Sequence, residues 1–434
     1  MRTKSFVGTF TKDRSTFGLT GTKPPGPSRP PPEAPPIIGW SPALHVRRLQ
    51  LTNFRNYRQA ELGPSPGRLL FLGDNAQGKS NLLEAVYFLA AGRSTRAGAD
   101  SEVIGWATEI DVQPFARLQA EVERGAGRVQ LEAVVAGPAA LPGGAARGGK
   151  RFRVNGIPRR GIDFVGQLRA VLFTADDLEI VSGPPASRRA YLDAAISQAD
   201  RAYYAALQRY GRLMQQRNAT LRRMKEGIAA PDELSLWDDA FCREGATVIA
   251  GRRDAVLALA ERAAAAHAEL SGGAGERLEI AYEPQLGDEW RGLLPAAAPQ
   301  AEVQALFAAA LASQRRREAA AGVSLVGPHR DDLRIELNGV SAAAFGSRAQ
   351  VRTAALSLRL AEAELLRGLD GDPPVVLLDD IVSELDERRR ASVLRGVQGF
   401  DQVWFTATTD AWLPPDFVAD CAVFRVRSGQ VEPA

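Results

Sequence analysis

The stretch GDNAQGKS (73–80) follows the apolar run RLLFL (68–72) and precedes NLLEAVYFLAA (81–91). A short apolar run, a glycine-rich loop and an apolar helical pattern, in this order, are typical of a strand–loop–helix unit. In such a unit the backbone N–H groups of the loop and of the helix N-terminus converge on phosphate groups. A chance glycine-rich loop is the alternative, but the order of the three segments favours a nucleoside triphosphate site.

The spacing Gly73-x-x-x-x-Gly78-Lys79-Ser80 is that of the P-loop. Its glycines allow the sharp turn, Lys79 provides a positive charge for the β- and γ-phosphate oxygens, and the Ser80 hydroxyl binds Mg²⁺. The predicted ATP-binding residues are Gly73, Asp74, Asn75, Ala76, Gln77, Gly78, Lys79 and Ser80.

The composition is that of an ordinary globular protein. The 434 residues are 45% hydrophobic and 24% charged, and this length predicts roughly two or three domains. No run approaches the roughly 18 apolar residues of a membrane span. The two cysteines, Cys242 and Cys421, provide neither a disulfide framework nor a zinc site. These features predict a soluble, cytoplasmic protein without a membrane partner, and the net charge of +3 does not by itself indicate nucleic-acid binding.

Residues 1–43 differ from the rest of the chain. GTKPPGPSRPPPEAPP (21–36) is too rich in proline for a packed element, because proline lacks a backbone donor. We expect a disordered proline-rich extension, with a transit peptide as the alternative because the segment is basic and poor in acids. The remainder is predicted to form the N-terminal part of an ATPase head (44–170), a helical arm domain (171–321) and the C-terminal part of the head (322–434).

Hydrophobic periodicity separates sheet from helix. Short alternating runs predict hairpins over 115–137 and 151–160, with a flexible tip at 141–150. An apolar stripe at steps of three or four predicts one helix from about 186 to 225, and a second helical pattern ends at SGG (271–273). Two such helices, each roughly 50–60 Å long and joined by a short linker, are antiparallel. Further elements are predicted at 44–57 (a strand), 301–320 and about 349–368 (helices).

The segment VVLLDD (375–380) supplies the second half of the nucleotide site. It has the continuous apolar pattern of a buried parallel strand, and a carboxylate at the C-terminal end of such a strand lies beside the P-loop. Asp379 is therefore predicted to hold Mg²⁺ together with Ser80, and Asp380 to orient or activate the attacking water as the catalytic residue. Asp379 follows Lys79 by 300 residues (379 − 79), so the ATPase is split in sequence by a helical domain.

A third motif precedes this strand. SRAQ (347–350), followed by a helical pattern, resembles the S-x-G-Q signature of ABC-type ATPases, and a helix N-terminus with a serine hydroxyl forms an anion site. SELD (383–386) resembles the D-loop of the same ATPases. Together they predict that ATP is bound between two subunits, each P-loop facing the signature of the other. The predicted signature residues acting in trans are Ser347, Arg348, Ala349 and Gln350, and the D-loop residues are Ser383 and Asp386.

From about residue 44 to 430 the chain resembles the RecF family of bacterial recombinational DNA-repair proteins. The segments that carry the resemblance are LTNFRNY (51–57), GDNAQGKSNLLEA (73–85), LFTADDLEIVSGPPASRRAYLD (172–193), YGRLMQQRN (210–218), VGPHRDDL (326–333), GSRAQVRT (346–353) and LLDDIVSELD (377–386). The resemblance implies an α/β fold: an ABC/SMC-like P-loop ATPase head with an inserted antiparallel helical arm domain.

The resemblance also implies a function. Such a protein binds ATP and Mg²⁺, forms an ATP-dependent homodimer on single-/double-stranded DNA junctions or gapped duplex, and helps to load recombinase with RecO and RecR in recombinational repair and replication restart. Slow, DNA-dependent ATP hydrolysis is expected to drive release. One departure concerns the signature, where Ala349 stands at the position that is usually glycine in the family. We expect its methyl group to weaken the clamping of ATP without abolishing function.

Basic residues of the arm are the candidates for DNA contacts. Arg188 and Arg189 either bind nucleic-acid phosphate or pair with acids such as Asp176 and Asp177. A basic stretch further along the arm either contacts the DNA backbone, with release of counterions, or is a solvated helix face. The predicted DNA contacts are Arg188, Arg189, Arg222, Arg223 and Lys225.

Two loops have open assignments. Arg55 and Asn56 either touch nucleotide, as in head ATPases of the SMC group, or form a plain surface turn. The loop HRDD (329–332) either serves the signature region or is a turn held by internal ion pairs.

Three other classes of P-loop protein compete with this function. A small-molecule kinase is disfavoured by the 300 residues between Lys79 and Asp379 (379 − 79). A transport ATPase subunit normally has a histidine after the strand that follows Walker B, but that region is VWFTATTD (403–410) and the only histidines are His45, His267 and His329. Another SMC-like head protein would carry a long coiled-coil tether, for which about 40 residues per helix are too few.

Overall fold

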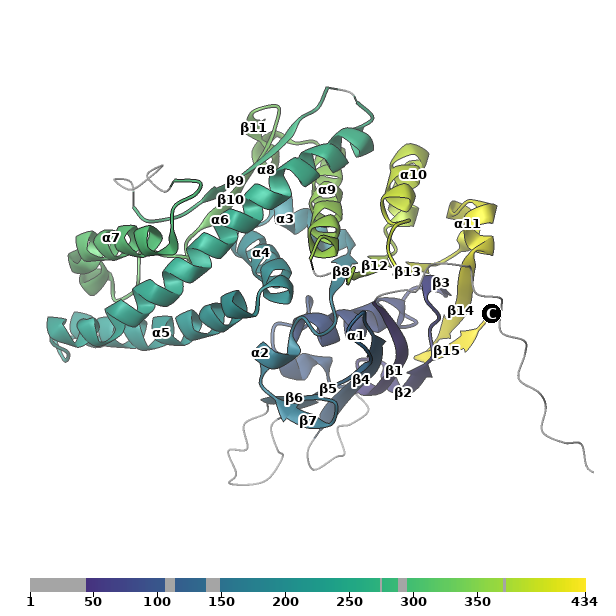
Figure 1. Ribbon diagram of the computed structural model, residues 1–434, viewed down its shortest axis with the longest axis horizontal. Helices are drawn as coiled ribbons and strands as arrows, with labels where there is room; N and C mark the ends of the chain where they lie inside the picture. The colour runs from purple at the N-terminus through teal and green to yellow at the C-terminus, as the bar shows by residue number, and fades with distance from the viewer. Residues whose placement is uncertain (1–43, 106–113, 138–148, 274, 288–294, 370–371) are drawn as a thin grey trace, which may run out of the picture. The chain divides into compact units, whose positions relative to one another are not determined.

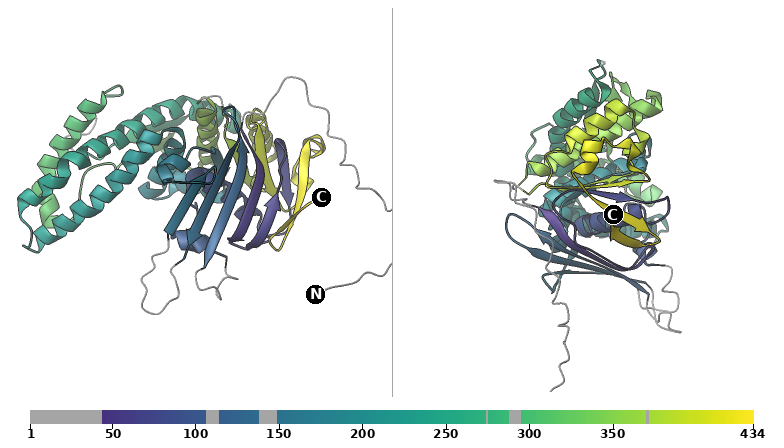
Figure 2. Two further views of the ribbon diagram at one scale, coloured as in Figure 1. Left: turned by 60° about the horizontal axis from the view of Figure 1, so that its bottom comes forward. Right: turned by 90° about the vertical axis from the view of Figure 1, so that its right-hand side faces the viewer.

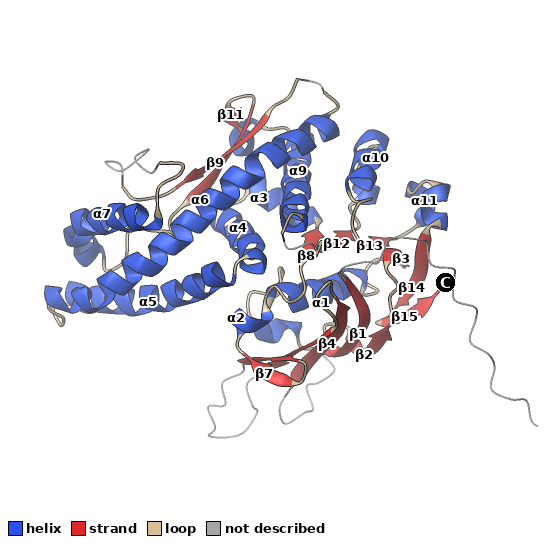
Figure 3. Ribbon diagram, in the orientation of Figure 1, coloured by secondary structure: helices blue, strands red, loops and turns tan. Residues whose placement is uncertain are grey.

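The computed structural model describes residues 44–105, 114–137, 149–273, 275–287, 295–369 and 372–434. The predicted extension (1–43) and most of the predicted hairpin tip (141–150) lie outside these residues. Residues 42–434 form one compact unit. Its described part contains three sheets and a group of long helices (Figure 1, Figure 3).

The first sheet is antiparallel and has six strands in the order β2-β1-β4-β5-β6-β7. It confirms the predicted strand near 44–57 and the predicted hairpins over 115–137 and 151–160. The alternating burial of β4 shows why, since every second side chain faces the core. The strands are β1 (His45–Phe54), β2 (Tyr57–Leu62), β4 (Phe115–Glu123), β5 (Val129–Ala136), β6 (Gly149–Val154) and β7 (Ile157–Arg159).

The second sheet has the order β15-β14-β3-β13-β12-β8 and is parallel from β14 to β8. Its strands come from three distant parts of the chain, and β13 separates the strand before the P-loop from the strand that ends in the two aspartates. The strands are β3 (Gly67–Leu72), β8 (Ala170–Phe173), β12 (Val375–Asp379), β13 (Gln402–Ala407), β14 (Cys421–Arg427) and β15 (Gln430–Pro433).

Helix α1 (Lys79–Ala91) lies between these two sheets, where almost all its residues are buried (Figure 1, Figure 2). The opposite face of the second sheet is covered by α9 (Arg348–Arg367), α10 (Glu387–Gly396) and α11 (Pro415–Ala419). In β12 the side chains alternate between the two cores, and the whole strand is apolar because both of its faces are buried. The predicted buried parallel strand is thus confirmed.

Long helices build a second region with its own apolar core. Helices α5 and α6 are antiparallel, because Tyr203, Arg209 and Arg217 contact residues at successively earlier positions of α6, namely Gly251, Glu244 and Asp238. A three-stranded sheet, β11-β10-β9, packs beside α6. The elements are α2 (Gly161–Phe164), α3 (Leu178–Ser182), α4 (Pro185–Ala199), α5 (Arg201–Lys225), α6 (Ser235–Ser271), α7 (Gln300–Ala321), α8 (Ala342–Phe345), β9 (Leu278–Glu283), β10 (Asp332–Leu337) and β11 (Val340–Ser341).

The prediction of a single helix from about 186 to 225 was wrong. The helix is interrupted at Asp200, whose backbone is extended (φ −129°, ψ 107°), so α4 and α5 are separate. The Asp200 carboxylate accepts hydrogen bonds from the N–H groups of Ala202 and Tyr203 and thereby caps α5. The apolar stripe continues across the break, because both helices pack on the same core, and the stripe alone could not reveal it. Of the two predicted long helices, α6 has the expected length, whereas α5 has 25 residues.

A fully buried arginine joins three arm helices. Arg217 of α5 donates to Glu318 of α7 at 2.6 Å, to Asp238 of α6 at 2.9 Å and to the Ser324 hydroxyl at 2.7 Å. Because the guanidinium and Glu318 are both removed from water, their separation would leave a buried charge without a partner. We infer that this contact fixes the helices rigidly to one another.

The loop 329–332 is held by internal contacts. This agrees with one of the two alternatives from the sequence, a turn held by internal ion pairs. Asp331 is buried and accepts hydrogen bonds from the N–H of Gln285, at 2.7 Å, and from the Tyr282 hydroxyl. Arg252 lies 3.6 Å from the same carboxylate. The loop therefore joins α6 to β9 and β10 through a buried ionic cluster.

His329 should make stability depend on acid pH. Its Nε2 lies 3.1 Å from the Ser324 carbonyl, which can only accept, so Nδ1 accepts from the Tyr210 hydroxyl at 2.7 Å. Burial lowers the pKa of His329 from 6.5 to about 4, so the unfolded chain binds a proton before the folded one does. Stability is therefore complete above pH 6.5 and falls toward pH 4, by up to about 3 kcal/mol.

The measurement is the free energy of unfolding from pH 7 to 4.5, in the wild type and in His329→Gln. Glutamine offers the same donor and acceptor without titrating, so its pH slope should be smaller. Equal slopes in the two proteins would contradict the assignment.

Candidate functional site

The loop between β3 and α1 has a conformation that requires its glycines. Gly78 has a φ of 116°, and a Cβ there would lie 2.6 Å from the side-chain nitrogen of Asn56. A Cβ on Gly73 would lie 2.3 Å from the carbonyl oxygen of Val426. A side chain at Gly73 would collide with backbone, whereas one at Gly78 would collide with side chains and would strain a positive φ. The two glycines of the pattern are therefore required for different steric reasons. The predicted strand and helix on either side of the loop are confirmed.

Lys79 folds over this loop. Its ammonium group donates to the carbonyl oxygens of Gly73, at 2.6 Å, and Asp74, at 2.9 Å. Burial lowers the pKa of Lys79, and the nearby carboxylates of Asp380, Asp379 and Asp74 oppose that shift. The positive charge therefore lies at the centre of the loop.

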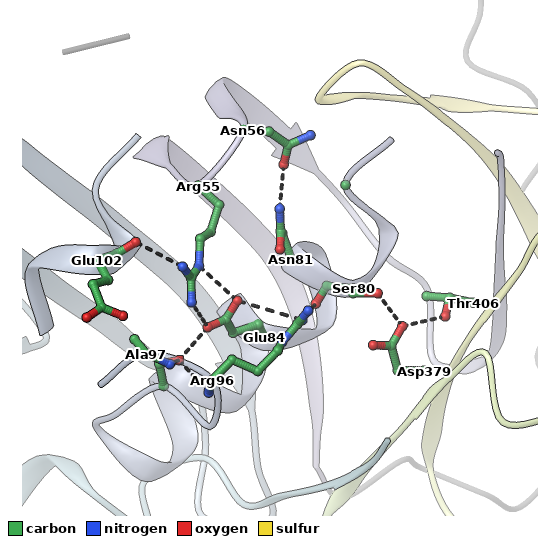
Figure 4. Close-up of polar contacts among 12 residues, drawn as sticks. Arg55, Asn56, Ser80, Asn81, Glu84, Arg96, Ala97, Glu102, Asp379 and Thr406 are labelled. Carbon is green, nitrogen blue, oxygen red and sulfur yellow. Dashed lines mark hydrogen bonds and ion pairs between the residues drawn. The ribbon is translucent and has the colours of Figure 1, made fainter. Parts of the chain in front are cut away.

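The acidic strand meets the P-loop helix as predicted. The Ser80 hydroxyl donates to Oδ1 of Asp379 at 2.8 Å, although the two residues are 299 positions apart in sequence (Figure 4). The same carboxylate oxygen accepts from the Thr406 hydroxyl at 2.9 Å. Parallel strands place these side chains at one edge of the sheet, because the carboxyl ends of β3, β13 and β12 lie together.

Asp380 adopts a left-handed backbone conformation with a φ of 53°. Its N–H donates to the Thr406 hydroxyl at 2.9 Å, and the Ser383 hydroxyl donates to its carbonyl at 2.8 Å and its carboxylate at 3.0 Å. The predicted D-loop serine thus contacts the predicted catalytic residue. Asp386 caps α10 by accepting from the N–H of Arg389 at 2.9 Å, and this bond is the main cause of its lowered pKa.

The predicted signature begins α9. The Ser347 hydroxyl accepts from the N–H of Gln350 at 3.3 Å, and the Gln350 side chain accepts from the N–H of Ser347 at 2.8 Å. This reciprocal capping box explains why the helix starts here. Ser347, Arg348 and Ala349 are exposed, and the Gln350 amide donates to Glu276. The serine hydroxyl and the helix N-terminus are therefore presented to solvent.

Comparisons with known proteins agree with this geometry. The family model described as the RecF/RecN/SMC N terminal domain matches residues 45–409. The DNA replication and repair protein RecF of Chloroflexus aurantiacus is 40% identical over 89% of this chain and 99% of its own length. RecF of Roseiflexus castenholzii is 41% identical over 90% of this chain and 100% of its own.

The chain belongs to the RecF family. A solved structure described as the recombination mediator protein RecF-ATP in the RecFOR pathway is 29% identical, with a TM-score of 0.77, and covers 90% of this chain and 98% of its own. The fold is accordingly that of the ABC/SMC-like ATPase head with helices, as the sequence predicted. In the part of the chain that the structure describes, no helix combines the length and the apolarity needed to cross a bilayer.

Sequence reasoning missed the side chains that brace the P-loop of this RecF-family protein. The Asn56 side chain donates to the Gln77 carbonyl at 2.9 Å, and the Tyr57 hydroxyl donates to the Gly78 carbonyl at 2.9 Å. From the other side, the N–H groups of Ser428 and Gly429 donate to the side chain and the carbonyl of Gln77, at 2.7 and 3.0 Å. The turn Ser428–Gly429 had no recognisable signal, because its partners lie about 350 positions away.

Arg55 contributes to a buried cluster beside the same helix. Its guanidinium donates to Glu84 at 2.7 and 3.1 Å, and Glu84 is fully buried (Figure 4). Arg96 lies 3.7 Å from Glu84 and donates to the carbonyl of Ser80 at 2.9 Å. Arg55 and Asn56 do form a turn, between β1 and β2, but it is not a plain surface turn because both side chains support the P-loop and the start of α1.

The predicted DNA-contact residues of the arm differ in their exposure and in whether their charge is already paired within the protein. Arg188 is buried and forms a two-pronged ion pair with Asp332, at 2.6 and 2.9 Å. Its predicted pairing with an acid is thus confirmed, but the suggested acids, Asp176 and Asp177, were wrong. Asp177 instead pairs with Arg359 at 2.7 Å. These partners are more than 140 positions apart, so proximity in sequence suggested the wrong acids.

Arg189 donates to the Asp331 carbonyl at 2.7 Å and is half-buried. The three basic residues at the end of α5, by contrast, are exposed. Of these, Arg223 lies 3.2 Å from Glu233. The end of α5 is thus the better candidate for contact with a polyanion, because the charge of Arg188 is buried and already paired with Asp332.

Proposed function

We propose that this chain is an ATP-binding protein of DNA replication and repair, in which ATP controls the association of two copies on DNA. The observation that carries the proposal is the 2.8 Å contact between Ser80 and Asp379, which joins the P-loop to the acidic strand. Membership of the RecF family supports it, because relatives carry the name DNA replication and repair protein RecF.

The residues present fit ATP and Mg²⁺. The loop 73–80 offers backbone N–H groups at a helix N-terminus and one lysine charge, which suit a triphosphate. The hydroxyl of Ser80 and the carboxylate of Asp379 are hard oxygen donors at adjoining positions, and such donors suit Mg²⁺. When bound, the ion neutralises charge on the β- and γ-phosphate oxygens.

In this proposal the protein residues have separate tasks. Lys79 binds phosphate oxygens, and Ser80 and Asp379 hold the metal. Asp380 orients the attacking water and accepts its proton, since the Ser383 hydroxyl holds its carboxylate in place. Mutation of Asp380 should therefore affect hydrolysis without removing the binding residues.

The signature is proposed to act in trans. Ser347 and the first N–H groups of α9 are exposed at a helix N-terminus, where they suit the γ-phosphate of an ATP bound to a second copy. Gln350 holds the serine in position through the capping box, and Ser383 and Asp386 form the D-loop beside Asp380. The methyl group of Ala349 is exposed and is proposed to weaken this contact without preventing it.

The arm is proposed to reach DNA. Arg222, Arg223 and Lys225 lie at the end of α5, where cations can neutralise backbone phosphates. We also propose the division into a split head (44–170 and 322–434) and an arm (171–321), because α4 to α7 share a core separate from that of α1. Strand β10 and helix α9 of the head also contribute to this second core and join the two parts. RecO and RecR are the proposed partners, and a gapped duplex is the proposed substrate, on the strength of the RecFOR pathway of the similar structure.

One experiment tests the whole proposal. Sedimentation is measured with ATP, with ADP and with neither, in the presence and absence of a gapped duplex. ATP alone should produce a dimer, and ATP with DNA should produce a dimer on the duplex. A monomer under all conditions would contradict the proposal.

Ser347→Arg separates binding in cis from binding in trans. The bulky cation should leave ATP affinity of the monomer within about twofold, because Ser347 makes only capping contacts within its own subunit. It should abolish ATP-dependent dimers by blocking the partner's phosphate. Ser347→Ala is the milder comparison, and its loss of the helix cap costs about 1 kcal/mol. Loss of ATP binding by the Ser347→Arg monomer would place the signature in cis.

A further inference from the structure

Thr406 lies between the two halves of the nucleotide site. It belongs to β13, which pairs with β3 on one side and with β12 on the other. In this register Thr406 stands opposite Asp379, and it is 1% exposed. No sequence motif marks this position.

The single hydroxyl of Thr406 contacts both acidic residues. Its oxygen accepts from the N–H of Asp380 at 2.9 Å, and its proton points to Oδ1 of Asp379 at 2.9 Å. The alternative acceptor, the Leu378 carbonyl, is farther away at 3.5 Å and carries no charge. The hydroxyl thus uses its donor on the first acid and an acceptor site on the second.

These contacts fix two different features of the site, namely the orientation of the Asp379 carboxylate and the backbone turn at Asp380. Oδ1 of Asp379 accepts from both Ser80 and Thr406, so the carboxylate is held by one hydroxyl from helix α1 and one from strand β13 (Figure 4). At Asp380 the chain turns into the left-handed region, with a φ of 53°, where non-glycine residues are uncommon. The bond from its N–H to Thr406 holds this turn, and the turn directs the Asp380 side chain toward Ser383.

We propose that Thr406 is a positioning residue that couples the metal-binding carboxylate to the catalytic one. It fixes the orientation of Asp379 toward the metal and the backbone turn that aims Asp380. This inference rests on the proposed function, because it assigns Thr406 a part in Mg²⁺-dependent ATP binding and hydrolysis. A buried threonine that only satisfies a backbone N–H would affect stability and neither of these properties.

Three variants test the proposal. Thr406→Val has nearly the same shape and the same preference for strands, and it lacks the hydroxyl. Thr406→Ser keeps the hydroxyl and loses a methyl group. Thr220→Val makes the same change at a buried threonine in α5, away from the nucleotide site. Melting temperatures identify a common temperature at which all proteins are folded.

The first readout is equilibrium ATP binding with and without Mg²⁺, and the second is kcat and KM for hydrolysis. Without Mg²⁺, Thr406→Val should bind ATP like the wild type, because the P-loop is unchanged. With Mg²⁺, its gain in affinity should be about tenfold smaller, comparable to the loss of one bond to a charged group. Its kcat should fall about 10- to 100-fold with little change in KM. Thr406→Ser should recover most of both properties.

The outcomes separate the inference from the function on which it rests. If Thr406→Val keeps the Mg²⁺ dependence of ATP binding and the kcat of the wild type, the positioning role alone is overturned. The same conclusion follows if Thr406→Ser is as impaired as Thr406→Val. Equal losses in Thr220→Val would also overturn it, because the effect would then be general destabilisation. A wild-type protein without Mg²⁺-dependent ATP binding would overturn the proposed function and this inference together.

Discussion

Lys79→Met should lower the equilibrium affinity for ATP by about 100- to 10,000-fold. The ammonium group lies over the P-loop and is the lysine charge that the loop offers to phosphate, and methionine keeps much of the aliphatic stem. Two bonds between charged groups contribute about 3–6 kcal/mol in total, which corresponds to this range. Titration calorimetry with ATP, in the presence of Mg²⁺, measures the effect.

The same variant should not unfold the protein. Lys79 is buried and burial lowers its pKa, so removal of the charge relieves part of the cost of desolvation. The melting temperature without nucleotide should therefore be at least as high as that of the wild type. Lys225→Met, at the exposed end of α5, is the matched control and should keep wild-type ATP affinity. Unchanged ATP affinity in Lys79→Met would mean that this loop is not the nucleotide site.

Asp380→Asn should lower kcat by about 100- to 10,000-fold, while ATP still binds. Asparagine has the same size and tolerates the same left-handed backbone, so its N–H can still donate to Thr406 and its side-chain oxygen can still accept from Ser383. Only the negative charge that acts on the attacking water is lost. ATP-dependent dimers should form normally and hold DNA for longer than the wild type.

The measurement is DNA dissociation after an ATP chase, at fixed salt because phosphate contacts are salt-sensitive. Asp379→Ala is the comparison, since loss of a ligand for the metal should weaken Mg²⁺-dependent ATP binding and thus dimer formation itself. If DNA lifetimes are equal in the wild type and Asp380→Asn, with hydrolysis absent in the variant, turnover does not control release.

The nucleotide site could be predicted where the residues of one short segment determine the local structure by themselves. The P-loop is a local turn whose glycines are required by positive φ and close backbone contacts, and the apolar strand before Asp379 is buried on both faces. The P-loop and Asp379 were expected to lie close together, because the carboxyl ends of parallel strands lie at the same edge of a sheet. The roles of Thr406, Tyr57 and Ser428 could not be found in this way, because two hydroxyls and a turn gain their roles only from distant partners.

The predictions of one helix boundary and of one ion pair were wrong for a related reason. The stripe from Ile196 to Tyr203 remains apolar across Asp200, since α4 and α5 contribute to one core. In the sequence, Asp200 cannot be distinguished from an exposed residue within a helix, and the structure shows that its carboxylate caps α5. Similarly, Arg188 has acids nearby in sequence, but the fold brings Asp332 to it from 144 positions away.

The strand order of the second sheet also has a consequence for protein synthesis. In the described residues β3 pairs with β13 and β14, and β13 begins 330 residues after β3 ends (402 − 72). At about 5–20 residues per second, a ribosome needs roughly 15–65 s to make that interval. During this time the apolar residues Leu69 to Leu72 have no strand partner, and the P-loop lacks the brace from Ser428. We therefore expect the nascent chain to depend on chaperones over this interval and to become able to bind ATP only after its last strands have left the ribosome.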